Sequence, residues 1–262
     1  MTIVFAFVAC IVAIAAAARS TWSPCGLSML ATITPLAEQG RGHRYRTTAI
    51  WFLAGSVFGG ASLGGLMVLL AAAVGALGAS TTQIALVAVG AGAVTLAAEV
   101  GVGGFRLPVH HRQVNERWLD QFRPWVYGAG FGWQIGAGLA TYIKTYAVYL
   151  MIALAALTAN PTLALLVGTV FGLVRGLSVF LGRHVTSTGA LADFHRRFMA
   201  ADPYALAAVV GCEAAATLAL SIAVSPWLAI AVAAVLGPFV LVWSRRLREG
   251  TAPIAKASVT VR

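Results

Sequence analysis

Long apolar segments recur along the whole of this 262-residue chain and are separated by short polar links. A helix needs about 20 apolar residues to cross roughly 30 Å of hydrocarbon. The segments that approach or exceed this length cover residues 3–36 (with an interruption), 49–77, 84–104, 126–157, 162–181, 204–224 and 227–243. They predict an all-α integral membrane protein with about seven transmembrane helices, in which residues 1–262 form a single polytopic membrane domain.

The placement of positive charge predicts how these segments cross the membrane. All but three of the 18 lysines and arginines lie in alternate links, at residues 38–48, 105–124, 183–203 and 244–262. The remaining links, at residues 78–83, 158–161 and 225–226, contain neither lysine nor arginine. Because cationic loops stay on the cytoplasmic side, the chain is expected to be a multi-pass protein of the inner cell membrane with a basic, cytoplasmic C-terminal tail.

The formal charge of +10 is therefore read as a topology signal, and no nucleic-acid partner is predicted. Only 10 % of the residues are charged, whereas soluble domains carry about a quarter. The basic links would also attract anionic membrane lipid, which is the expected partner of that surface.

The first apolar segment is too long to be one upright helix. A continuous helix over residues 2–36 would be about 52 Å long, so a break is expected near residues 23–26. One interrupted crossing gives seven spans with the N-terminus outside, and two short crossings give eight spans with the N-terminus inside. The segment lacks the charged start of a signal peptide.

The expected break carries a proline and a thiol. Pro24 has no N–H and disfavours helix at Ser23, whereas Gly26 tolerates unusual backbone angles. Irregular backbone at membrane depth is tolerated only where protein or a water-filled cavity satisfies its polar groups. Cys25 then lies either in a working site or in a kinked packing helix with an inert thiol. The candidate motif or hinge residues are Ser23, Pro24, Gly26, Thr32 and Pro35.

Five charged residues fall inside predicted spans: Arg19 in the interrupted first segment, and four that are candidate site residues. Each would cost about 2.5–3.5 kcal/mol near the bilayer centre, so they should form pairs or face water. Lys144 and Glu213 lie deep in their segments, and Glu99 and Arg175 lie nearer the cytoplasmic ends. Matched depth predicts the pairs Lys144–Glu213 and Glu99–Arg175. Such pairs would fix helix register or form a path for a solute or proton, and the alternative is snorkelling of the long side chains to the interface.

Glycines at a spacing of four residues predict close helix packing. They occur as Gly55/Gly59, Gly60/Gly64, Gly128/Gly132/Gly136 and Gly168/Gly172/Gly176.

The cysteines and histidines indicate neither a metal site nor a cofactor. Cys10, Cys25 and Cys212 all lie in apolar segments, and an odd, buried set does not form a secreted disulfide framework. His110 and His111 lie in a basic link and are read as loop charge rather than as a ligand pair. No nucleotide-binding or nucleophile-elbow motif occurs, which excludes common soluble-enzyme chemistry.

The chain resembles the CcdA/DsbD transmembrane thiol-redox family, within the broader group of LysE-like transporters. The resemblance covers about residues 3–181 and rests on Ser23–Pro24–Cys25, on RYRTTAIWFLAGSVFGG at 44–60 and on YGAGFGWQIGAGLATYI at 127–143. It implies an inverted repeat, with halves at about 3–104 and 126–224, an extra span at 227–243 and a broken first helix. It also implies transfer of reducing equivalents at Cys25 to or from a thioredoxin-like partner, as in cytochrome c biogenesis.

The chain departs from that family where a second cysteine is expected. Residues 135–142 contain neither cysteine nor proline, and thiol–disulfide exchange needs a resolving sulfur. Enzymatic electron transfer would therefore require Cys10 or Cys212 as the second thiol. The alternatives are a redox-silent small-solute transporter or exporter that uses the same cavity and its intramembrane charges, and a structural or assembly subunit without chemistry. The sequence leaves the oligomeric state open.

Overall fold

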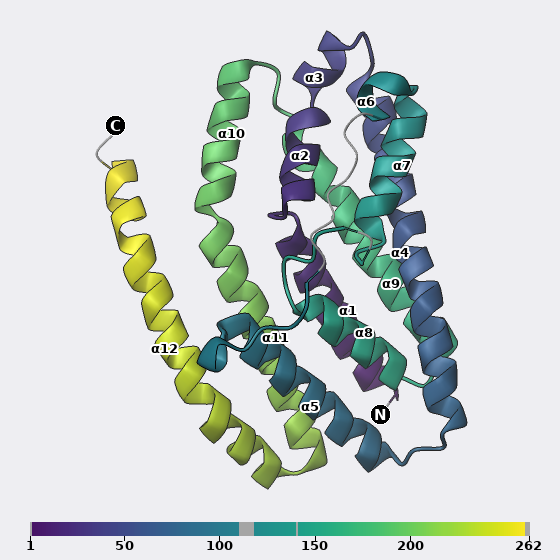
Figure 1. Ribbon diagram of the computed structural model, residues 1–262, viewed down its shortest axis with the longest axis vertical. Coiled ribbons are helices and arrows are strands. Elements are labelled where there is room, and N and C mark those ends of the chain that lie inside the picture. The colour runs from purple at the N-terminus through teal and green to yellow at the C-terminus, as the bar shows by residue number, and fades with distance from the viewer. Residues whose placement is uncertain (1, 110–117, 140, 260–262) are drawn as a thin grey trace.

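The computed structural model describes residues 2–109, 118–139 and 141–259, and this part of the chain is helical throughout, with no strand (Figure 1). The first half contains α1 (Thr2–Ser20), α2 (Pro24–Thr32), α3 (Pro35–Gly40), α4 (Tyr45–Ala76), α5 (Thr81–Val100) and the short 3-10 helix η1 (Val102–Gly104). The second half contains α6 (Trp118–Gln121), α7 (Pro124–Gly136), α8 (Ala147–Leu157), α9 (Pro161–Leu177), η2 (Ser178–Gly182), α10 (Thr188–Ala200), α11 (Asp202–Val224) and α12 (Pro226–Val259).

Six helical segments are long and apolar enough to cross a membrane, which confirms a helical membrane bundle. They are Thr2–Ser20, Tyr45–Ala76, Thr81–Val100, Pro161–Gly182, Thr188–Val224 and Pro226–Arg245. The segment expected at residues 126–157 is not one helix, because α7 ends at Gly136 and α8 begins only at Ala147. Gly138, with φ +65°, turns the chain between them. The polar residues Thr141, Lys144 and Thr145 follow.

The break expected in the first helix is confirmed, and a side chain caps the start of each of the two short helices that follow it. Ser23 precedes α2, and its Oγ accepts a hydrogen bond from the Gly26 N–H at 3.2 Å. Thr34 precedes α3 and accepts from the Ala37 N–H at 3.1 Å. A proline follows each cap, at a position where its missing N–H leaves no unmet hydrogen bond. Since α2 has only nine residues, α1 is the one candidate span before α4 in the described chain.

The predicted glycine contacts join α4 to α7 and α9, which run beside it in Figure 1. A Cβ added to Gly55 would lie 2.0 Å from the Ala129 carbonyl oxygen, and one added to Gly136 would lie 2.0 Å from that of Ser56. The Ser56 hydroxyl donates to the Gly172 carbonyl of α9 at 2.8 Å. Backbone therefore meets backbone across the centre of the bundle, as small residues permit in membranes.

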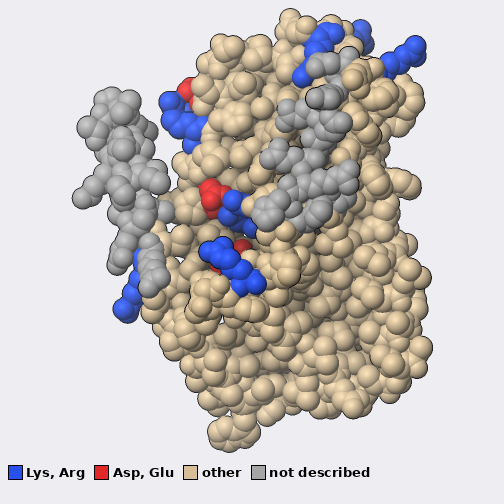
Figure 2. Space-filling model, viewed as in Figure 1, with Lys and Arg blue, Asp and Glu red and all other residues tan. Residues whose placement is uncertain are grey.

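The helices bury two apolar clusters. The larger one is built from α1, α4, α5, α8, α9 and α11, and the smaller one surrounds α2 and includes Cys25, Met29, Phe52 and Phe131. At the edge of the bundle lies α12, which contacts α11 and α5, and none of the residues in its apolar window is buried (Figure 1). Figure 2 shows charged side chains at the top and at mid-height of one face, above a lower part without them.

The division into two halves, at about 3–104 and 126–224, stays a prediction. A broken helix, a long helix and a further helix occur as α1/α2, α4 and α5, and again as α7/α8, α9 and α11. The inverted symmetry itself stays a prediction.

The contact of α4 with α7 can be tested with alanine at Gly55. We expect Gly55→Ala to lower the free energy of unfolding by about 1–3 kcal/mol, because the added methyl group meets backbone that cannot rotate away. Gly65→Ala on the same helix is the matched control, since a Cβ there meets nothing within 4 Å. Thermal unfolding in detergent measures both variants, and equal melting temperatures would contradict the packing.

Candidate functional site

The break between α1 and α2 brings Cys25 into the protein interior. The first turn of α2 folds against the end of α1 so closely that a Cβ on Gly26 would lie 2.1 Å from the Thr21 carbonyl oxygen. Only glycine fits there, which explains its place next to the thiol. Cys25 is 2 % exposed and belongs to the smaller apolar cluster, whereas Cys10 and Cys212 pack against the larger one. The three cysteines are thus divided between two clusters.

Arg175 lies near this break rather than beside Glu99. It is 2 % exposed, in the last turn of α9, and its Cζ lies 5.8 Å from the centroid of the Phe171 ring. None of the ion pairs among the described residues includes Arg175. The expected Glu99–Arg175 pair is therefore wrong. A cation over an aromatic face and near a polarisable sulfur is stabilised without a carboxylate.

Glu99 instead holds the start of α8. Its Oε2 accepts hydrogen bonds from the Tyr146 N–H at 2.6 Å and from the Thr145 hydroxyl at 3.0 Å. The first N–H groups of a helix have no partner within the helix, and a carboxylate at this position accepts a hydrogen bond from one of them. Its negative charge is also attracted to the positive end of the helix dipole. The charges of Arg19 and Lys144 act on the same carboxylate.

The pair Lys144–Glu213, which the sequence had predicted, is wrong. It lies in the irregular stretch between α7 and α8, where depth counted along a continuous helix no longer applies. Glu213 is fully buried on α11, and neither of its oxygens has a hydrogen-bond partner among the described residues. Thr95 on α5 lies near it but directs its hydroxyl to the Gly92 carbonyl.

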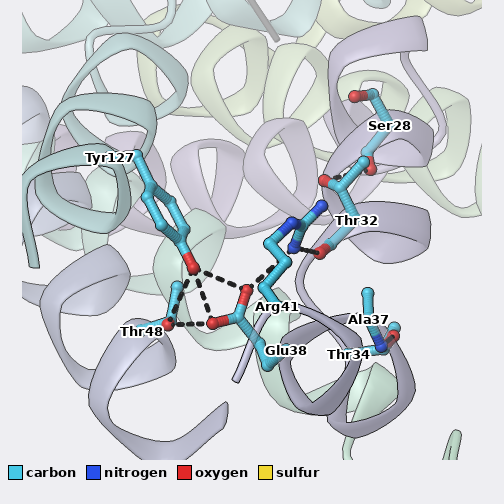
Figure 3. A network of polar contacts seen from close by, with 8 residues as sticks. All are labelled: Ser28, Thr32, Thr34, Ala37, Glu38, Arg41, Thr48 and Tyr127. Carbon is cyan, nitrogen blue, oxygen red and sulfur yellow. Dashed lines mark hydrogen bonds and ion pairs between the residues drawn. The ribbon is translucent and has the colours of Figure 1, made fainter. Parts of the chain in front are cut away.

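A buried carboxylate at the other end of the bundle joins three helices (Figure 3). Glu38 of α3 is 0 % exposed, and the Tyr127 hydroxyl of α7 contacts its Oε1 at 2.8 Å and its Oε2 at 2.6 Å. The Thr48 hydroxyl of α4 donates to Oε2 at 2.5 Å. Arg41 pairs with Oε1 at 3.0 Å and also donates to the Thr32 carbonyl at 2.8 Å.

This network explains how the α2–α3 segment is held against α4 and α7. A buried charge is costly unless its oxygens are hydrogen-bonded, and here both are. Thr32 contributes its carbonyl to Arg41, and its hydroxyl donates to the Ser28 carbonyl at 2.8 Å. Pro35 begins the short helix that carries Glu38. Sequence reasoning missed Glu38, although one signal was present: it is the only acidic residue in the basic link at 38–48.

The structure does not test the interpretation of His110 and His111 as loop charge. His110 and His111 lie outside the described residues. Within the described residues, no group of three or more His, Cys, Asp or Glu side chains is placed to hold a metal ion.

Comparison with known proteins gives similarity to a set of proteins named methylamine utilization protein MauF. The relative from Methylophilus methylotrophus is 32 % identical over 61 % of this chain and 56 % of its own length. That from Paracoccus denitrificans is 32 % identical over 64 % and 60 %, and that from Methylobacillus flagellatus is 27 % identical over 76 % and 72 %. The chain thus spans less than two thirds of the first two relatives. No family model and no solved structure matches it.

These names correct the resemblance inferred from the sequence. The relatives are called methylamine utilization proteins and not CcdA or DsbD proteins, so the assignment to the CcdA/DsbD thiol-redox family was wrong. The function that this resemblance implied, thiol-redox transfer at Cys25, was therefore wrong as well. The small-solute transporter alternative finds no support in these names either. The Ser–Pro–Cys element misled because two of its three residues, Ser23 as the cap and Pro24 in the first helical turn, have a purely structural reason.

The Glu38 network can be tested by removing one hydroxyl. We expect Tyr127→Phe to lower the free energy of unfolding by about 1.5–3 kcal/mol, because a buried carboxylate loses a donor to both oxygens. Tyr45→Phe is the matched control, since the Tyr45 hydroxyl donates to the neutral Val179 carbonyl at 2.9 Å. Tyr45→Phe should lower the free energy of unfolding by about 0.5–1.5 kcal/mol.

A double-mutant cycle of Tyr127→Phe with Glu38→Gln, followed by thermal unfolding in detergent, measures the coupling. We expect about 0.5–3 kcal/mol for residues in contact. Strict additivity would mean that the hydroxyl and the carboxylate do not interact.

Proposed function

We propose that this chain is a membrane-embedded accessory protein of methylamine utilization, with a structural or assembly role. The observation that carries the proposal is the similarity to the MauF proteins, at 27–32 % identity. Their name supplies the process. That this chain works in the same process as its relatives, and that the matched region carries the whole role, is our inference.

The internal geometry supports a structural role for the polar residues. The carboxylate of Glu38 fastens α3 to α4 and α7, and the carboxylate of Glu99 fastens the end of α5 to the start of α8. Each of these buried charges is occupied in holding a helix end. The centre of the bundle is packed backbone to backbone along α4, which makes it a stiff framework.

The proposal predicts a specific growth defect. A methylamine-using host that lacks the gene should fail to grow with methylamine as sole nitrogen source and should grow normally with ammonium. The wild-type gene should restore growth, and Cys25→Ser should restore it equally, because no thiol chemistry is involved. The readouts are growth rate and the amount of protein in the membrane.

Two results would count against the proposal. Normal growth of the deletion strain on methylamine would remove the link to this process. Loss of growth with Cys25→Ser at a normal membrane level would show that the thiol does chemistry, which a purely structural role excludes.

We further propose that the protein lies in the inner cell membrane with its basic links and C-terminus in the cytoplasm. The positions of the links support this orientation. Basic segments lie next to α3, α6 and α10, which lie toward the same end of the molecule, and the α4–α5 and α11–α12 links lie at the other (Figure 1). The α8–α9 link lies at the same end as the α4–α5 link, since Ala159 is close to Gly75 in the last turn of α4.

Single-cysteine labelling in spheroplasts tests this orientation. Thr81→Cys should react with a membrane-impermeant maleimide added outside, and Arg196→Cys should react only after permeabilisation. Both positions are exposed, so access and not burial decides the result. The unsubstituted chain gives the background from its own cysteines, and the reverse pattern would invert the topology.

A further inference from the structure

A polar cavity of about 380 Å³ lies where α1, α5, α11 and α12 come together at mid-height of the bundle. Its lining includes the cationic residues Arg19, Arg106 and Lys144, the carboxylate of Glu99, and the aromatic side chains of Tyr146 and Trp243. Figure 2 shows basic and acidic side chains gathered at mid-height of one face. Irregular backbone on either side of Lys144 borders the cavity, as expected where membrane-depth backbone lines a polar space.

Positive charge is in excess here. Arg19 pairs with Asp202 at 2.5 Å, and Glu99 is engaged by the start of α8. Neither Arg106 nor Lys144 takes part in an ion pair within the described part of the chain. Among the described residues, three cations against two carboxylates leave one positive charge over.

Arg19 is the most deeply buried of the three cations. Its side chain is only 4 % exposed, and its Nε has no hydrogen-bond partner among the residues that the structure describes. A buried charged donor without a partner is costly. An anion in the cavity would compensate the excess charge next to Arg19.

An apolar cleft of about 350 Å³ continues from the polar cavity. It lies between η1 and α12, is lined by Val102, Pro238, Phe239 and Val242, and shares Val100, Gly101 and Trp243 with the polar cavity. A charged chamber that opens into an apolar cleft matches a molecule with an anionic head and a hydrocarbon chain. Tryptophan at the junction is typical of the level where headgroup and acyl region meet.

We propose that these two cavities form one binding site for an anionic phospholipid. Its phosphodiester lies among Arg19, Arg106 and Lys144, and one acyl chain lies along Phe239 and Val242. Phosphatidylglycerol, with one negative charge, matches the excess charge of the chamber. The lipid would fill the space between α12 and the rest of the bundle and thereby hold that helix in place. This inference does not depend on the metabolic process in which the protein works.

Lipid titration of the full chain tests the site. The protein is purified in detergent, stripped of lipid and titrated with phosphatidylglycerol or phosphatidylcholine, and native mass spectrometry counts the bound molecules. We expect phosphatidylglycerol to bind the wild type more tightly. Arg106→Gln with Lys144→Gln should weaken its binding about thirtyfold, since each basic residue near the surface contributes about fivefold.

The matched control is Arg196→Gln with Arg197→Gln, which removes the same charge from α10, away from the cavity. It should leave phosphatidylglycerol binding within about twofold of the wild type, as expected for a specific site rather than a general charge effect. An equal loss in both double variants, or equal binding of the two lipids by the wild type, would overturn the proposal.

Val242→Trp separates a lipid from a soluble phosphate and does not disturb the charges. The bulkier side chain should block the apolar cleft and abolish tight binding of phosphatidylglycerol. Its position on the exposed side of α12 makes misfolding a minor concern, and the melting temperature checks it. If glycerol 1-phosphate bound the wild type as tightly as phosphatidylglycerol, or if Val242→Trp left lipid binding unchanged, the site would be one for a soluble phosphate and the lipid assignment would fail.

Discussion

Backbone hydrogen bonding in an apolar medium is the constraint on which this structure depends. In hydrocarbon, each peptide N–H and C=O needs a partner within the protein, so a helix can stop only where other groups replace its missing bonds. The chain meets this demand at each interruption. Ser23 and Thr34 cap the pieces of the first broken helix, and Glu99 accepts from the start of α8 after the second.

The same constraint explains where the buried charges lie. Glu38 is on a six-residue helix that has little stability of its own, and Glu99 is at the junction of α5 with the irregular stretch before α8. Arg175 is at the end of α9, close to the break that carries Cys25. Charges in this protein accompany helix ends, where backbone dipoles and orphan polar groups offset the cost of burying them. Glu213, in mid-helix and without a partner among the described residues, departs from this rule.

Sequence reasoning succeeded where a local rule decides the outcome. Apolar length predicted six of the seven expected spans correctly, Pro24 predicted the break and glycine spacing predicted close helix packing. It failed where the outcome depends on distant parts of the chain. Lys144 was placed by counting along a helix that is in fact interrupted, and Glu38 was read as part of a solvated link because its partners Thr48 and Tyr127 lie far along the chain. The family resemblance failed because Ser23 and Pro24, two residues of its one specific element, are also what a capped helix start favours.

The glycine faces of α4 have a consequence for the order in which the protein is made. Their partners are encoded much later, since the Ser56 hydroxyl bonds to a carbonyl 116 positions further along the chain. When α4 leaves the ribosome and enters the bilayer, its bare backbone has only lipid to contact, and α7 and α9 do not yet exist. The first half of the protein must therefore wait in the membrane in an unfinished state, with its tightest contact surface open until the second half has been inserted.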